Sequence, residues 1–183
     1  IVSCNDQATV SLAQSTLTGA GVDISSNVTF LVVPNNSIWV RDYGPNCVYA
    51  NSVDSLYFVD WKYNRLTRPK DDTLPSSIAE HLGVPLFTTT LAPDDLINTG
   101  GNFMSDGMGT AFASELILSE NEPGNEYNVT AKTESDINNI LFDYMGINRY
   151  IKMEKLPYDG IHHIDMHMKL LDEETVLVGQ YPE

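Results

Sequence analysis

Residues 74–102 read LPSSIAEHLGVPLFTTTLAPDDLINTGGN, and the order of elements in this stretch decides the fold. The apolar pattern predicts a helix near 74–82 that ends at Gly83. A strand over 86–91 should follow, because a short apolar run is bounded there by turn-forming residues. The stretch ends in a polar motif, Asn98-Thr99-Gly100-Gly101-Asn102. A tight Asp106-Gly107 turn and a strand over 110–118 then complete one helix, strand and hairpin unit.

The same order of elements precedes this stretch. Asp6 can cap a helix over Val10–Leu17, and a buried strand is expected over 28–33. A polar motif, Trp39 to Pro45, comes next. Strands over 47–50 and 56–63 should then form a hairpin.

The order occurs once more after the quoted stretch. A helix over 134–144 is predicted to end at Gly146, and a strand over 150–156 should follow. The polar motif here is His162 to His167. A hairpin through Asp172-Glu173-Glu174 closes the third unit.

The three polar motifs are evenly spaced. Asp42, Asn102 and Asp165 lie 60 and 63 residues apart. A period of this length predicts a repeat architecture with units near 1–66, 67–120 and 121–183. If the units surround an axis, the three motifs face one central cavity. We therefore expect a single α/β domain that forms an incomplete ring of about three units.

Composition limits the function. The chain has 183 residues with 10 Lys and Arg against 25 Asp and Glu, a formal charge of −15. This balance argues against nucleic acid as the main partner, because phosphate binding needs a cationic surface. No apolar run reaches the roughly 18–20 residues that a membrane helix requires, so no membrane span is expected. The start of the sequence suggests a processed or trimmed product, and abundant Asn, Ser and Thr leave both export and a cytoplasmic location open.

The third motif is the most informative single segment. If 162–169 is a strand, His163, Asp165, His167 and Lys169 share one face. His163 could then act as a general acid or base with Asp165 beside it, and nearby carboxylates should raise the pKa of His163. Two alternatives remain at this point: a solvated polar face, or a metal site formed by His163, Asp165 and His167.

The other two motifs are weaker on their own. In the first motif, adjacent side chains point apart, so Asp42 can face inward while Arg41 binds the backbone or another acid; a plain Arg41–Asp42 ion pair is the alternative. In the second motif, Gly100 and Gly101 permit close approach of a ligand, although a bulge without function explains them equally well. Cys4 and Cys47 can form one disulfide or none, and their spacing predicts no zinc site.

Taken together, the motifs carry a family resemblance. Trp39-x-Arg41-Asp42-x-Gly44-Pro45, then Gly100-Gly101-Asn102, then His163-x-Asp165, in this order and spacing, resemble the bacterial, Porphyromonas-type peptidylarginine deiminases. These belong to the agmatine and arginine deiminases, the guanidino-group-modifying (pentein) superfamily. The resemblance extends over essentially the whole chain. It implies an α/β-propeller of five units, of which this chain supplies about three.

The resemblance also implies roles for individual residues. His163, Asp42 and Asp165 are the implied catalytic residues, and no metal or other cofactor is implied. The implied substrate-binding residues are Asp42, Asp165, Trp39, Gly101, Asn102 and Arg65. Two carboxylates suit a guanidinium, because its planar N–H groups pair with them in bidentate fashion.

The chemistry implied by the resemblance needs a cysteine thiolate, which attacks the guanidinium carbon and leads to loss of ammonia and a ureido product. In the family that cysteine lies near the C-terminus of the full enzyme, whereas Cys4 and Cys47 lie elsewhere. We therefore expect the chain to be the N-terminal part of a longer deiminase domain, and to be inactive alone.

The resemblance favours protein arginine as the substrate, converted to citrulline. Thr99 stands where agmatine deiminases generally carry Glu. The resemblance makes Arg65, with Arg68, a candidate to receive a substrate's terminal carboxylate, and solvated surface cations are an equal alternative for both residues. The expected partner is thus an arginine-containing peptide or a small guanidino compound, and the oligomeric state is left open. The alternatives are an agmatine deiminase of putrescine biosynthesis and a non-catalytic cation-binding module.

Overall fold

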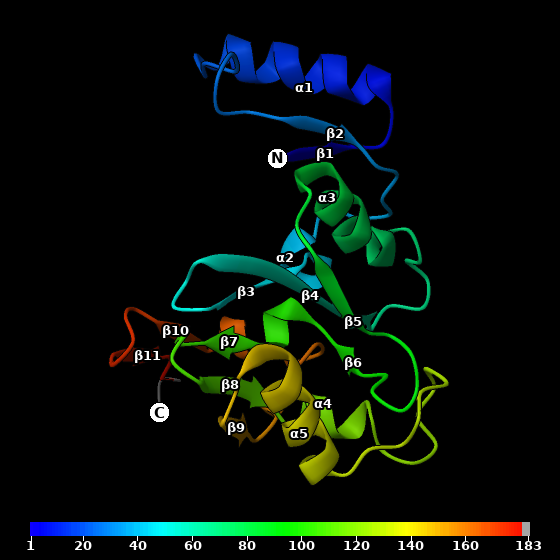
Figure 1. Ribbon diagram of the computed structural model, residues 1–183, viewed down its shortest axis with the longest axis vertical. Coiled ribbons are helices and arrows are strands. Elements are labelled where there is room, and N and C mark those ends of the chain that lie inside the picture. Colours follow the sequence, from blue (N-terminus) through cyan, green and yellow to red (C-terminus); the bar gives the residue numbers. More distant parts are fainter. Residues whose placement is uncertain (181–183) are drawn as a thin grey trace.

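The computed structural model describes residues 1–180, which form an α/β protein (Figure 1). The last three residues of the third predicted unit lie outside the described residues. The described α-helices are α1 (Gln7–Gly19), α2 (Val40–Tyr43), α3 (Leu74–Leu82), α4 (Leu116–Ser119) and α5 (Glu134–Met145). Three single turns of 3₁₀-helix are η1 (Asp71–Thr73), η2 (Gly100–Asn102) and η3 (Ile164–Met166). None of these helices has the length and apolar character needed to cross a membrane.

The strands of this part of the chain form four small sheets, and two of the sheets are mixed. One is parallel, β1 (Val2–Cys4) with β2 (Phe30–Val32). The first mixed sheet contains β3 (Asn46–Ala50), β4 (Ser55–Tyr63), β5 (Leu86–Thr89) and β6 (Ile97–Asn98). The second contains β7 (Met104–Ser105), β8 (Thr110–Ser114) and β9 (Arg149–Met153). The last is the antiparallel hairpin of β10 (Met168–Leu170) and β11 (Val176–Val178).

Most predicted elements are present. Asp6 caps α1 by accepting a hydrogen bond from the Thr9 amide, and α3 has the predicted bounds with Gly83 at its end in the left-handed conformation. Helix α5 begins with a capping box at Thr133 and ends at Gly146. The β3–β4 and β10–β11 hairpins also form as predicted.

Two of the predicted strands include residues that are helical instead. The strand predicted over 110–118 ends at Ser114, after which the chain turns into α4. Ile117 and Glu120, three residues apart, are buried there while the two residues between them are partly exposed, which is a helical and not an alternating pattern. The stretch 162–169 is also not one strand, because η3 occupies its centre and strand pairing begins only at Met168.

The largest hydrophobic core joins the two mixed sheets to α5. Its fully buried side chains include Leu96, Ile117 and Ile137, and the rings of Trp61 and Phe103 pack edge to face with centroids 5.3 Å apart. Figure 1 shows α5 lying beside β8 and β9, whereas α1 covers the separate β1–β2 pair. The described residues form no closed barrel, so the ring of repeated units stays a prediction.

Asp71 anchors the loop that leads to the first polar motif. This fully buried carboxylate accepts hydrogen bonds from the backbone amides of Asn36 (2.6 Å) and Ser37 (3.1 Å) and from the Ser37 hydroxyl (2.7 Å). We expect Asp71→Asn to lower the free energy of unfolding by about 3 kcal/mol, because charged acceptors are lost in a buried place. Urea unfolding measures the change. A loss no larger than that of exposed Asp143→Asn would contradict this role.

Asp60 on β4 gives the fold a dependence on pH. Burial and, to a smaller extent, the nearby Asp72 raise the pKa of Asp60 to about 8. The folded chain thus keeps a proton that the unfolded chain releases near pH 4, so stability falls as the pH rises from about 4 to 8. We expect Asp60→Asn to be more stable than the wild type by a few kcal/mol at about pH 8 and to approach it near pH 4. Thermal unfolding across this range, with exposed Asp54→Asn as control, tests the prediction, and identical pH profiles would refute it.

Candidate functional site

The first polar motif forms a short helix, α2, that presents Asp42. The Gly44 amide closes the turn by donating to the Val40 carbonyl at 2.8 Å. The buried Tyr43 hydroxyl donates to the Ser37 carbonyl at 2.6 Å. These bonds fix the backbone on both sides of Asp42, so its side chain has a defined direction.

Asp42 and His163 meet although they are 121 residues apart in the chain. Asp42 Oδ1 lies 3.6 Å from His163 Nδ1, and the His163 ring is buried. Gly101 packs against both groups: a Cβ atom at this position would overlap His163 Nδ1 and lie 2.7 Å from Asp42 Oδ1. Residues of all three motifs, Asp42, Gly101 and His163, thus lie together, whereas one central cavity lined by the motifs stays a prediction.

Asp165 joins the cluster through Arg41. His163 precedes η3 and Asp165 lies within it, so the two residues are related by a tight turn and not by strand alternation. Arg41 Nε lies 3.9 Å from Asp165 Oδ2, and Arg41 Nη2 donates to the Phe103 carbonyl at 2.9 Å. The expectation that Arg41 binds backbone and a neighbouring acid while Asp42 faces inward is confirmed.

The charge state of His163 differs from the expectation. Burial lowers the pKa of His163 and outweighs the opposing effect of Asp42 and Asp165, so the predicted rise was wrong. Burial likewise raises the pKa of Asp165, against the effects of His163 and Arg41. His163 Nε2 is buried and has no hydrogen-bond partner among residues 1–180. A neutral imidazole with one nitrogen beside Asp42 and the other unpaired can accept or donate a proton.

The Gly100-Gly101-Asn102 motif holds the site together. A Cβ atom on Gly100 would overlap the Arg41 carbonyl, so this glycine lets η2 pack on α2. The Asn102 side chain accepts from the Ser114 amide (2.8 Å) and donates to the Ser114 carbonyl (3.3 Å). Contacts of Gly101 and Asn102 with a substrate stay predictions; in this structure both residues are engaged with the protein.

The remaining predicted residues surround this cluster. Trp39, which precedes α2, is 55% exposed and available to a ligand. Arg65 follows β4 and donates to the Asn64 carbonyl at 3.3 Å, and Arg68 donates to the Tyr63 hydroxyl at 3.4 Å. Their contacts with a substrate likewise stay predictions.

The metal alternative lacks support from the geometry. His167 Nε2 lies 3.1 Å from Asp159 Oδ2, so this ring pairs with a residue outside the predicted ligand set. Within residues 1–180, no three His, Cys, Asp or Glu side chains are grouped so that they could hold a metal ion. Cys4 and Cys47 are both free thiols, the first buried and the second exposed.

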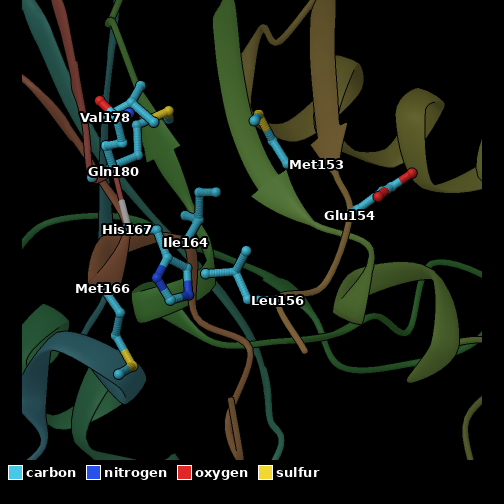
Figure 2. A pocket seen from close by; sticks show the side chains of 10 residues that line it. Met153, Glu154, Leu156, Ile164, Met166, His167, Val178 and Gln180 are labelled. Carbon is cyan, nitrogen blue, oxygen red and sulfur yellow. The ribbon is translucent and has the colours of Figure 1, made fainter. Parts of the chain in front are cut away.

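An apolar pocket of about 340 Å³ lies beside η3 (Figure 2). It is lined by Ile164, Met166 and His167 from the third motif and by Leu156 and Val178, among others. Asp42, His163 and Asp165 lie outside this lining. The pocket therefore borders the segment that carries Asp165 without containing the charged cluster.

Comparison with known proteins identifies the family. The profile described as Porphyromonas-type peptidyl-arginine deiminase matches residues 1–183. A Lactococcus lactis protein provisionally named agmatine deiminase is 33% identical over 119 residues, which are 60% of this chain and 31% of that protein. The solved agmatine deiminase of Enterococcus faecalis is 24% identical, with a TM-score of 0.69 over 90% of this chain and 45% of that one.

A solved Porphyromonas gingivalis protein, provisionally named arginine deiminase, is 20% identical, with a TM-score of 0.73 over 97% of this chain and 50% of that one. The chain thus spans between 31% and 50% of these three proteins. The solved structures show the fold alone, and it is the α/β fold of the pentein superfamily. Because the family profile covers the whole sequence, the chain belongs to the Porphyromonas-type peptidyl-arginine deiminase family.

Proposed function

We propose that this chain supplies the guanidinium-binding and proton-transfer groups of a deiminase that hydrolyses an arginine side chain to citrulline and ammonia. The observation that carries the proposal is the packing of Asp42 and His163, 3.6 Å apart, on Gly101 with Asp165 beside them. Two carboxylates offer four acceptor oxygens to a planar guanidinium. The geometry supports a site for a cationic, planar group.

The proposed reaction replaces one C–N bond by a C–O bond. A cysteine thiolate attacks the guanidinium carbon, and the tetrahedral adduct expels ammonia with a proton from the imidazolium of His163. Water then attacks the thiouronium carbon after losing a proton to His163, and the thiolate leaves. The products are a ureido group and ammonia, and no oxidant or reductant is consumed.

In this proposal the nucleophilic cysteine lies outside the chain. Cys4 is buried in β1, in the sheet that α1 covers, and Cys47 is exposed on β3. The chain also spans half or less of its solved relatives. We therefore expect the 183-residue chain to bind guanidinium compounds weakly and to release no ammonia from them.

Agmatine is the second candidate substrate, and the names of the relatives favour it. The Lactococcus lactis and Enterococcus faecalis proteins are both named agmatine deiminases. Agmatine and peptidyl arginine share the guanidinium, so the Asp42 and Asp165 pair does not distinguish them. The difference lies at the other end of the substrate, where agmatine carries an amine.

Ammonia release by the longer deiminase that contains this chain tests the proposal. It is assayed with a peptide ending in arginine and with agmatine. Faster release from the peptide supports the protein-arginine proposal, and faster release from agmatine replaces it with the second candidate. Binding without release from either compound would leave a cation-binding module and refute the enzymatic proposal.

A further inference from the structure

A buried carboxylate, that of Glu120, contacts the side chain of the residue directly before Arg65. Asn64 Nδ2 donates to Glu120 Oε1 at 2.7 Å, and the Tyr127 hydroxyl donates to the same oxygen at 3.1 Å. Glu120 and Asn64 are both buried, so the bond between them is shielded from water. Such a charge-assisted bond holds the backbone at Asn64, the residue directly before Arg65.

Arg65 contacts the same residue, Asn64. Its guanidinium folds back to donate to the Asn64 carbonyl at 3.3 Å. The charge of Arg65 also affects two pKa values. It helps, after burial, to lower the pKa of His163, and it opposes the rise in the pKa of Glu120. Asn64 thus links the two residues, since its side chain bonds Glu120 and its carbonyl accepts from Arg65.

The ends of β4 and β6 hold further polar groups without protein partners. The two strands are parallel, and Tyr63 pairs with Asn98. The next residue of each strand, Asn64 and Thr99, therefore leaves the sheet at the same edge. Asn64 Oδ1, Asn98 Nδ2 and Thr99 Oγ1 are buried and have no hydrogen-bond partner in the described part of the chain. Buried polar groups of this kind favour a polar ligand at this edge, directly before Gly100 and Gly101.

Glu120 can change its charge near neutral pH. Burial raises its pKa to about 7, although Asn64, Tyr127 and Arg65 oppose the rise and Glu126 adds to it. Below that pH the charge of Arg65 is not balanced by Glu120, and above it the two charges offset each other. The affinity of Arg65 for an anionic group should accordingly fall as the pH rises through about 7.

We propose that Glu120 is a positioning residue of this site, which holds Arg65 through Asn64 and sets how much of the Arg65 charge is available to a substrate carboxylate. The inference rests on the proposed deiminase function for its substrate. It adds a residue, Glu120, that the motifs do not include. It also predicts for which substrates the affinity depends on the charge of Glu120. These are the substrates with a free carboxylate on the arginine residue.

The coupling itself is measured on the 183-residue chain by NMR, without substrate. The Arg65 Nε–Hε signal and the Glu120 carboxyl carbon are followed across about pH 5.5 to 8.5. Both signals should show a step near pH 7, and Glu120→Gln should remove the Arg65 step. Exposed Glu122→Gln is the matched control and should leave it unchanged.

A second variant keeps the test decisive if Glu120→Gln does not fold. Tyr127→Phe removes one donor to the carboxylate, so it should move the Arg65 step to higher pH. A wild-type Arg65 signal without a step near pH 7 would overturn the proposal. So would a step that persists unchanged in Glu120→Gln or stays in place in Tyr127→Phe.

The substrate part is measured on the longer deiminase with two peptides that end in arginine, one with a free carboxylate and one amidated. The ratio of kcat/KM for the peptide with a free carboxylate to kcat/KM for the amidated peptide should fall by about twofold to fivefold between pH about 6 and about 8. Taking the ratio removes the common effect of His163 ionisation. In Glu120→Gln the ratio should stay at its low-pH value, and in Arg65→Gln it should be near one throughout.

A ratio that varies with pH equally in the wild type and Glu120→Gln would overturn this part. If no guanidino compound is turned over, the proposed function fails and the substrate role of Glu120 fails with it. The NMR titration then still decides whether Glu120 and Arg65 are coupled, so the two failures are distinguishable.

Discussion

Gly101→Ala should reduce deimination by the proposed longer deiminase by about 100-fold or more. The added Cβ would overlap His163 Nδ1 and lie 2.7 Å from Asp42 Oδ1, so the two groups cannot keep their 3.6 Å separation. Gly101 is buried within η2, which packs on the third motif, so the methyl group has little room to move away. Steady-state kinetics with the better of the two candidate substrates measures the loss.

The matched control is Gly160→Ala. Gly160 lies three residues before His163, and a Cβ atom there would meet no atom within 4 Å. We expect this variant to keep near wild-type activity and stability. Gly101→Ala with unchanged activity would show that the contact between Asp42 and His163 has no part in the reaction.

His163→Gln should have an effect of similar or larger size, a loss of about 10²–10⁴-fold in kcat, the usual range for a general acid and base. Gln can form hydrogen bonds but cannot carry the proton that the leaving ammonia requires. His81→Gln, on the exposed face of α3, is the control. A loss confined to KM would contradict a proton-transfer role and leave His163 a binding residue.

The wild-type pH profile should reflect the environment of His163. Because burial holds the pKa of His163 below its ordinary value, the neutral ring persists to lower pH than in a solvated histidine. Because the proposed loss of ammonia needs the imidazolium form, kcat/KM should have a limb that falls as the pH rises through a value below 6.5, the ordinary His value. In His163→Gln this limb should disappear.

Much of the site could be predicted from the sequence, because its residues lie in short motifs at equivalent places along the chain. The spacing of Asp42, Asn102 and Asp165 indicated segments that meet, and the structure brings Asp42, Gly101 and His163 together. Helices α3 and α5 were also predictable, because each has strong periodicity and ends at a glycine in the left-handed conformation.

The rest depends on tertiary contacts that a local pattern does not contain. Alternation over 162–169 suggested a strand, but the turn of η3 after His163 breaks it. The direction of the His163 pKa shift was missed because the number of nearby carboxylates is visible in the motifs whereas burial is not. Glu120 was missed for the same reason, since only folding brings it to Asn64, 56 residues away in the chain.

The most direct test of the central claim, that Asp42, His163 and Asp165 form a guanidinium site, is NMR mapping of arginine methyl ester binding to the 183-residue chain. We expect weak, saturable shift changes at Asp42, Gly101, His163 and Asp165. Asp42→Asn and Asp165→Asn should each weaken them, because each variant removes one carboxylate of the pair. Citrulline methyl ester, which lacks the cationic fork, is the control and should cause none of these changes. Shift changes confined to other residues, or binding unaffected by both variants, would contradict the claim.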